Sequence, residues 1–179
     1  MVWSEAAIAP LQELQTTLRG IHAQAPWRWI ALADLHLTLR FYGDASHGLA
    51  HRLAAGLAGD VAQTPVSMLE FTGFAAWGTV RSRVVVARFR ATRVLRGLQT
   101  AAEKQARECG LAPETRRFQP HVTLARADTE WDGEIARVKL APFELPAVEI
   151  GLWYRGLQAD SPRYAAFGRY ACGCPRPLA

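Results

Sequence analysis

The chain has little cysteine, almost no lysine and no long apolar run, and each shortage excludes a class of protein. Three cysteines in 179 residues, an odd number without a spaced framework, argue against a disulfide scaffold and against a zinc ribbon. No stretch of 18 or more apolar residues occurs, and the N-terminus lacks the pattern of a signal peptide. We therefore expect a cytoplasmic protein without a membrane span.

The basic charge of the chain is carried almost entirely by arginine. Of 21 basic residues only Lys104 and Lys139 are lysines, and the net charge is +5. Arginine binds phosphate through two parallel hydrogen bonds, which favours an anionic partner such as RNA or a nucleotide. A GC-rich genome that prefers arginine codons is the alternative explanation of the same composition. Net charge alone reports only on solubility and loose binding.

Helical and strand-like periodicities alternate along the whole chain. We expect helices over 4–19, 47–58 and 92–109, and strands over 35–41, 66–74, 83–90, 120–125, 143–152 and 163–170. Between these elements we expect a loop over 23–34, a turn over 75–79, a turn at 160–162 and a frayed tail after Cys172. Hairpins mixed with long helices predict an α+β fold. No linker divides the chain, so we treat residues 1–179 as a single domain.

The most informative feature is a motif of four residues that occurs twice. His-Leu-Thr-Leu occupies 36–39, and His-Val-Thr-Leu occupies 121–124. In a strand, alternate side chains share a face, so each histidine points the same way as its threonine while the apolar residues point into the core. The same alternation puts Arg40 on the face of His36 and turns Phe41 toward the core. Two such strands side by side would gather two imidazoles and two hydroxyls in one cleft.

Two histidines and two threonines are sufficient for acid–base chemistry on a phosphate. Histidine has an ordinary pKa of about 6.5, so near neutral pH one imidazole accepts a proton while the other donates one. Displacement at phosphorus is in line, so the attacking and leaving oxygens lie on opposite sides. Threonine hydroxyls donate hydrogen bonds to the non-bridging oxygens, where negative charge is held in the transition state. This scheme calls for neither a metal nor another cofactor.

Competing kinds of site fit the sequence less well. Zinc usually takes three or four protein ligands, whereas each motif supplies one histidine followed two residues later by threonine. The chain has no phosphate-binding glycine-rich loop, no Gly-x-Ser-x-Gly turn and no cysteine near either motif. The remaining histidines, at 22, 47 and 51, lack the motif and are expected on helix surfaces or in loops.

The doubled His-x-Thr motif resembles the 2H phosphoesterase superfamily. The flanking segments 35–43 and 116–126 are similar to the two motif regions of RNA 2',3'-cyclic phosphodiesterases, also called the 2'-5' RNA ligase family, and Pro162-Arg163-Tyr164 is similar to a turn before their last strand. The resemblance implies a bilobal fold of two antiparallel sheets with outer helices, a pseudo-two-fold axis and a central cleft. It further implies metal-independent hydrolysis of RNA 2',3'-cyclic phosphate ends to a 2'-phosphate.

The resemblance also implies a role for each motif residue. His36 corresponds to the general acid and His121 to the general base, although the near-symmetric sequence does not itself assign the two roles. Thr38 and Thr123 correspond to residues that hold the phosphate. Two arginines, Arg116 and Arg126, match positions that bind phosphate or the RNA backbone, and a solvated surface position is the alternative for either.

Three other functions remain open at this point. The same site run in reverse would join RNA ends through a 2'-5' bond, and a narrower cleft would suit a small cyclic nucleotide such as ADP-ribose cyclic phosphate. A non-catalytic RNA-binding module would need no such histidine pair. No obligate protein partner is evident.

Family members usually begin with an apolar strand. Residues 1–3 here lead almost directly into a helix, so we expect the first strand to be missing or truncated.

Overall fold

The structure is a computed structural model. It describes residues 5–62, 64–65, 67–79, 81–127, 135, 143–147, 149–155 and 164–172. The helices are α1 (Glu5–Ile21), α2 (His47–Ala62), α3 (Arg93–Glu108) and the short 3-10 turn η1 (Leu32–Asp34). The strands are β1 (Trp27–Trp29), β2 (Ser67–Thr79), β3 (Ser82–Phe89), β4 (His121–Ala127), β5 (Glu144–Ala147), β6 (Glu149–Arg155) and β7 (Tyr164–Ala171).

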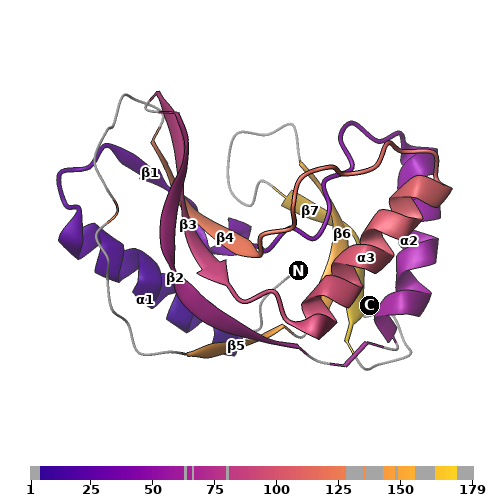
Figure 1. The fold of residues 1–179 in the computed structure, drawn as a ribbon, viewed down its shortest axis with the longest axis horizontal. Coiled ribbons are helices and arrows are strands. Elements are labelled where there is room, and N and C mark those ends of the chain that lie inside the picture. Colours follow the sequence, from indigo (N-terminus) through magenta and orange to yellow (C-terminus); the bar gives the residue numbers. More distant parts are fainter. Residues whose placement is uncertain are drawn as a thin grey trace.

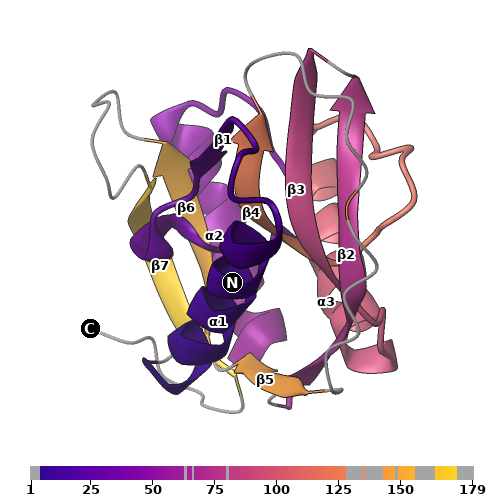
Figure 2. The same cartoon turned by 90° about the vertical axis from the view of Figure 1, so that its left-hand side faces the viewer.

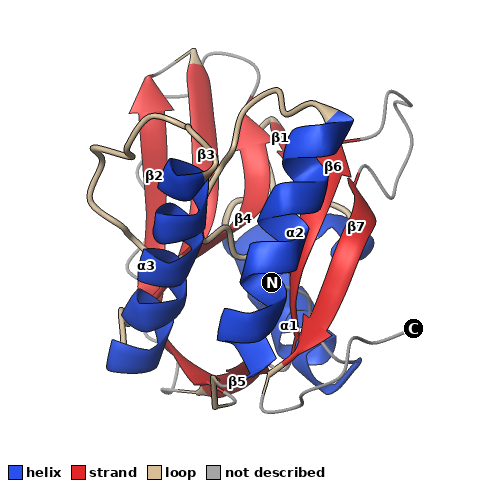
Figure 3. Ribbon diagram, turned by 90° about the vertical axis from the view of Figure 1, so that its right-hand side faces the viewer, coloured by secondary structure: helices blue, strands red, loops and turns tan. Residues whose placement is uncertain are grey.

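The strands form two antiparallel sheets of unequal size. The larger sheet has the order β1-β4-β3-β2-β5, and the smaller one consists of β6 and β7. Helix α1 covers the outer face of the larger sheet (Figure 1, Figure 2). Helix α2 packs on β6 and β7 and lies beside α3 (Figure 3). The fold is therefore α+β with two antiparallel sheets and helices on their outer sides, as the sequence predicts.

Helix α3 illustrates how local sequence sets an element. The hydroxyl of Thr92 accepts a hydrogen bond from the Leu95 amide at 3.2 Å, which satisfies one of the free donors at the start of the helix. Its buried residues recur at helical spacing: Leu95, Leu98, Ala102 and Ala106. After Cys109, Gly110 adopts a φ of +86°, a conformation that ends helices and that favours glycine. The helix expected over 92–109 thus includes the two capping residues, Thr92 and Cys109, that flank α3.

Helix α1 is fastened to the larger sheet by a buried polar side chain. The Nε2 amide of Gln15 donates to the carbonyl oxygens of Ile30 and Leu124 at 2.8 and 2.9 Å. Gln15 is only 4% exposed, so these bonds satisfy donors that water does not reach. The carbonyl of Leu124 also accepts the Ile30 amide at 2.9 Å. One side chain thus joins α1, the segment after β1 and the strand that carries the second motif.

Several expected elements are wrong. The segment 35–41 is not a strand: among the described residues it makes a single β-bridge, at Leu37. The supposed turn over 75–79 is the end of β2, and the loop over 23–34 contains β1 and η1. The strand expected over 143–152 divides between the two sheets, since β5 pairs with β2 while β6 pairs with β7.

Other expectations fall on residues outside the described part of the chain. They concern residues 1–4, where the first strand was expected to be missing, the turn at 160–162 with most of the Pro-Arg-Tyr segment, and the tail after Cys172. Within the described residues, no helix is both long and apolar enough to cross a membrane. Cys109 and Cys172 are free cysteines.

Candidate active site

The two motifs meet directly in the structure. Leu37 of the first motif and Val122 of the second form an antiparallel β-bridge, and the side chains of both are completely buried. Leu124 is also completely buried, and Leu39 packs against the same core. The apolar positions of both motifs therefore point into the core, as strand alternation predicts. The bridge supplies the contact that the sequence could not specify, because it joins residues 85 positions apart.

The register of this bridge sets the motif side chains diagonally. In an antiparallel pair, residues on either side of a bridged pair also face each other, so His36 lies opposite Thr123 and Thr38 lies opposite His121. The histidines thus occupy one diagonal of a small square, and the threonines occupy the other. Both imidazoles are half-buried, whereas Thr38 is exposed and Thr123 is half-buried.

Each imidazole is oriented by the same local hydrogen bond. The Nδ1 of His36 lies 2.7 Å from the carbonyl oxygen of Asp34, and the Nδ1 of His121 lies 2.7 Å from that of Gln119. A carbonyl oxygen only accepts, so both Nδ1 atoms carry the proton and donate it. In the neutral imidazole the Nε2 atom is then a free acceptor, and in the protonated imidazole it is a donor. Each histidine thereby offers Nε2 for proton transfer.

An aromatic ring flanks each histidine. The ring of Tyr164, the first residue of β7, meets the His36 imidazole edge-on at a centroid distance of 4.7 Å. The ring of Trp77 in β2 meets the His121 imidazole in the same manner at 4.6 Å. The first contact brings the smaller sheet to the site, so the site lies between the two sheets. Trp77 was missed because β2 was expected to end before it. Alternation along the full strand puts Gly73, Ala75 and Trp77 on one face.

The protonation of His36 depends on its surroundings. Burial lowers the pKa of His36, while its hydrogen bond to the Asp34 carbonyl opposes that shift. Electrostatic repulsion from His121 contributes a further lowering, as expected for two imidazoles in one site. In the free protein His36 therefore prefers the neutral form.

A β-bulge decides which way Arg126 points. Val85 pairs with Ala125 and Val86 pairs with Thr123, so Leu124 is an extra residue in β4. Without the bulge, alternation would turn Arg126 to the face opposite Thr123. With it, Arg126 is exposed between the buried Ala125 and Ala127, on the face that carries the motif.

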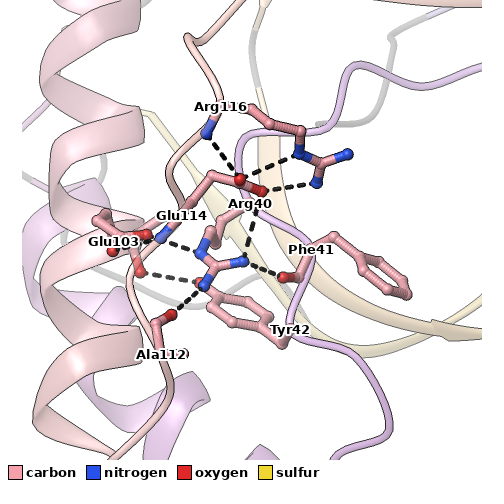
Figure 4. Close-up of polar contacts among 8 residues, drawn as sticks. Arg40, Phe41, Tyr42, Glu103, Ala112, Glu114 and Arg116 are labelled. Atoms are coloured by element: carbon pink, nitrogen blue, oxygen red, sulfur yellow. Dashed lines mark hydrogen bonds and ion pairs between the residues drawn. The ribbon is translucent and has the colours of Figure 1, made fainter.

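Arg40, expected on the cleft face, is instead a structural anchor (Figure 4). Its guanidinium donates to a carboxylate oxygen of Glu103 at 2.7 Å, to the Ala112 carbonyl at 2.7 Å and to the Phe41 carbonyl. The side chain is only 10% exposed. The chain has left the strand geometry after Leu37, which is why alternation fails here.

Of the two aromatic residues that follow, Phe41 is also placed differently from the expectation. Phe41 was expected to face the core, but it is 68% exposed. Tyr42 is half-buried beside Leu53 and Leu152, and its hydroxyl donates to the Ala102 carbonyl at 3.4 Å. Burial raises the pKa of Tyr42 to about 12. Tyr42 therefore packs against α2 and β6 and is joined to α3 by its hydroxyl.

Arg116 is held by a neighbouring carboxylate. Its Nε and Nη2 atoms lie 3.0 and 2.6 Å from the two carboxylate oxygens of Glu114. The hydrogen bonds from Arg116 lower the pKa of Glu114 to about 2. The pair is exposed, with 80% of the Arg116 side chain accessible. Arg116 thus already has an anionic partner, whereas Arg126 has none among the described residues.

The histidines outside the motifs lie where the sequence predicts them. His47 and His51 are exposed on α2, and their rings contact each other and Phe167. His22 follows α1 and contacts the ring of Trp27. Within the described part of the chain, no group of three or more histidine, cysteine, aspartate or glutamate residues is arranged to hold a metal ion.

Two antiparallel sheets, with a paired His-x-Thr site between them, define the class of LigT-like α+β proteins. Comparison with solved structures agrees. LigT of E. coli complexed with 3'-AMP is 26% identical and has a TM-score of 0.72, with 92% of each chain covered. TT0787 of Thermus thermophilus is 24% identical, with a TM-score of 0.74 over 96% of this chain and 94% of that one, and shares the fold.

The profile of the 2'-5' RNA ligase superfamily matches residues 3–159, so the chain belongs to that superfamily. Two curated relatives are each called RNA 2',3'-cyclic phosphodiesterase. The Geobacillus stearothermophilus protein is 27% identical over 154 residues, which are 81% of this chain and 48% of that protein. The Bacillus subtilis protein is 28% identical over 118 residues, which are 65% and 63%. The chain thus spans about half the length of the first of these relatives and under two thirds of the length of the second.

Proposed function

We propose that this protein hydrolyses RNA 2',3'-cyclic phosphate ends to 2'-phosphates, without a metal, by acid–base catalysis with His36 and His121. The observation that carries the proposal is the diagonal histidine pair. Each imidazole donates Nδ1–H to the carbonyl two residues before it and keeps Nε2 available. Two oriented proton-transfer groups on one face match the two proton transfers that the reaction needs.

The reaction uses each group at a stated atom. His121 Nε2 takes a proton from water as the water oxygen bonds to phosphorus. The bond between phosphorus and the 3' oxygen breaks, and His36 Nε2–H gives its proton to that oxygen, leaving a 3'-hydroxyl and a 2'-phosphate. Attack and departure on opposite sides of phosphorus suit two histidines at opposite corners of the site.

The remaining side chains of the site stabilise charge. Hydroxyl groups of Thr38 and Thr123 donate to the non-bridging oxygens, where charge is held in the transition state. The guanidinium of Arg126 on the same face binds the phosphate or the RNA backbone. Arg116 stays a candidate for the backbone, although binding RNA there would compete with Glu114.

Protonation of His36 is coupled to substrate binding. In the free site burial lowers the pKa of His36, which works against a general acid. A bound cyclic phosphate carries a negative charge next to the imidazole and favours its protonated form. We infer that substrate binding helps to supply the proton that His36 then donates. The names of the curated relatives and of the superfamily support the reaction class.

The decisive experiment is hydrolysis of an RNA oligonucleotide with a 2',3'-cyclic phosphate end in the presence of EDTA, with the product isomers resolved. A 2'-phosphate is the expected product. His36→Ala and His121→Ala should each lower kcat by about 10²–10⁴, as for loss of a general acid or base. His47→Ala, an exposed histidine on α2, is the matched control and should keep full activity. Near-full activity of either motif variant would overturn the two-histidine mechanism.

The same assay separates the alternatives. Formation of a 2'-5' bond when a 5'-hydroxyl RNA is added would identify ligation at this site. The 5'-hydroxyl oxygen would then bond to phosphorus in place of water while the bond to the 3' oxygen breaks. Turnover of ADP-ribose cyclic phosphate but not of RNA would indicate a small-nucleotide enzyme. RNA binding without turnover of any cyclic phosphate would leave a binding module. A cytoplasmic location stays a prediction.

A further inference from the structure

A pocket opens beside His121 that the proposed chemistry does not use. Its volume is about 360 Å³, within the range of small-ligand sites. His121 is not among the residues that line it. The lining comes from β2, from the end of β3 and from the segment before β4, and includes Thr72, Arg88, Arg117, Phe118, Gln119 and Pro120.

Two connections tie this pocket to the candidate active site. Arg88 on β3 is the cross-strand partner of His121 on β4, so both side chains stand on the same face of the sheet. Gln119 lines the pocket, and its carbonyl accepts the Nδ1–H of His121. A group bound in the pocket therefore lies next to a group bound at His121.

The pocket carries two positive charges that have no acidic partner among the residues the structure describes. Arg88 and Arg117 are both exposed, and the described part of the chain gives neither of them an ion pair or a hydrogen bond. Neighbouring arginines differ: Arg116 is paired with Glu114, and Arg90 with Glu70. Two unneutralised guanidinium groups on one pocket are suited to an anion with several oxygen acceptors, such as a phosphodiester.

The rest of the lining suits a nucleotide. A bulge in β2 leaves Thr72 without a partner on β3, and its exposed side chain lines the pocket. The half-buried ring of Phe118 offers an apolar surface for a base or sugar. Gly73 of β2 is the cross-strand partner of Arg88. A Cβ atom built onto Gly73 would lie 3.7 Å from the guanidinium of Arg88, so this side chain lies over the backbone of β2.

We propose that this pocket binds the phosphodiester on the 5' side of the terminal nucleotide, with Arg88 and Arg117 as its ligands. The inference rests on the proposed function: the cyclic phosphate lies between the histidines, and the chain of the RNA continues past His121 into the pocket. Cross-strand neighbours are about 4.5–5.5 Å apart at Cβ, so an arginine beside His121 reaches a group one nucleotide away. The pocket would make the protein specific for RNA ends rather than for nucleoside cyclic phosphates.

Kinetics on two matched substrates test this specificity. We expect kcat/KM for a dinucleotide that ends in a 2',3'-cyclic phosphate to exceed that for the corresponding nucleoside 2',3'-cyclic phosphate by about tenfold or more. The double variant Arg88→Ala/Arg117→Ala should remove most of this preference. The control, Arg52→Ala/Arg107→Ala, loses the same net charge from exposed positions on α2 and α3 and should retain the preference.

A binding measurement separates failure of this inference from failure of the proposed function. Anisotropy of a labelled oligoribonucleotide with a 3'-phosphate, measured in EDTA, needs no catalysis. The Arg88→Ala/Arg117→Ala variant should bind it about tenfold more weakly than the control variant and with a smaller dependence on salt, since each lost phosphate contact lowers the slope by about 0.7. If the two double variants show the same substrate preference or the same RNA binding, the proposal that the pocket binds this phosphodiester is wrong. Absence of turnover on both substrates overturns the proposed function. The comparison of RNA binding by the two double variants then tests the role of the pocket independently of catalysis.

Discussion

At the scale of single residues, the two motifs prepare each histidine by the same means. The acceptor for Nδ1 is a backbone carbonyl two residues earlier, at Asp34 or Gln119, rather than a third side chain. A backbone carbonyl does not titrate, so the orientation of the imidazole holds over the whole pH range in which histidine works. The sequence requirement is then only the histidine and a suitable backbone path.

The pH dependence of the single variants should reveal which histidine is the acid. In His36→Ala the remaining group is the base His121, so residual kcat/KM should rise with pH to a plateau. In His121→Ala the remaining group is the acid His36, so residual kcat/KM should fall as pH rises. The inflection should lie below the ordinary value of about 6.5, because burial lowers the pKa of His36. If residual kcat/KM instead fell with pH in His36→Ala and rose with pH in His121→Ala, the acid and base roles would be exchanged.

Residues of the site were predictable from sequence to different degrees. The His-x-Thr pattern specifies which side chains share a face, because that depends only on local alternation. The burial of Leu37 and Val122 follows from the same pattern. The role of Arg40 does not follow from this pattern, because its partners Glu103 and Ala112 are more than 60 positions away. Trp77 was missed because two glycines near it favour a turn locally, whereas pairing with β3 keeps it in a strand.

At the scale of elements, the first motif is held in place without being a strand. Its own pairing with β4 amounts to the bridge at Leu37. What fixes the following residues is the guanidinium of Arg40, which joins them to Glu103 on α3 and to the carbonyl of Ala112 after that helix (Figure 4). The position of His36 therefore depends on packing against α3 as well as on β4.

Removing this anchor should destabilise the fold. Arg40→Ala leaves the mostly buried carboxylate of Glu103 without its charged partner, and we expect a loss of about 1–3 kcal/mol in the free energy of unfolding, measured with urea. Arg40→Lys keeps the charge but not the planar fork, so it should recover only part of the loss. Arg116→Ala removes an exposed pair and should change stability little. An unchanged urea midpoint in Arg40→Ala would contradict the anchoring role.

The divided strand near the C-terminus is another effect of tertiary structure. Residues 143–152 carry a continuous strand-like pattern, yet Glu144–Ala147 joins the larger sheet and Glu149–Arg155 joins the smaller. Pro146 lacks an amide donor and lies in β5, an edge strand, where a missing donor is tolerated. Glu149, the first residue of β6, forms a bidentate ion pair with Arg169 of β7, with N–O distances of 2.7 and 2.8 Å. One segment thus links both sheets.

At the scale of the whole molecule, three exposed arginines stand on the strands beside the site. Arg28 of β1 is the cross-strand partner of Arg126, both are exposed, and Arg88 stands beside His121 on the same sheet. Like charges on neighbouring strands oppose folding. They favour the binding of a polyanion, because phosphates release counterions when arginine neutralises them. The net charge of +5 adds attraction over a longer range.

RNA binding should therefore weaken steeply with salt. For wild-type protein and a single-stranded oligoribonucleotide, log Kd plotted against log salt concentration should rise with a slope of about 0.7 for each phosphate contacted. Arg126→Ala should reduce that slope by about one contact, whereas Arg52→Ala on α2 should leave it unchanged. A slope near zero for the wild type would mean that the arginines do not contact the RNA backbone.

The sequence by itself determined the α+β class, the three long helices, the inward-facing apolar residues and the two His-x-Thr faces, because each depends on contacts within a few residues. Only the tertiary structure decided the register of Leu37 against Val122, the bulge that turns Arg126 to the site, the anchoring of Arg40 and the pocket of Arg88 and Arg117. Those features join residues tens of positions apart. Their free energy comes from burial and pairing that local periodicity does not encode.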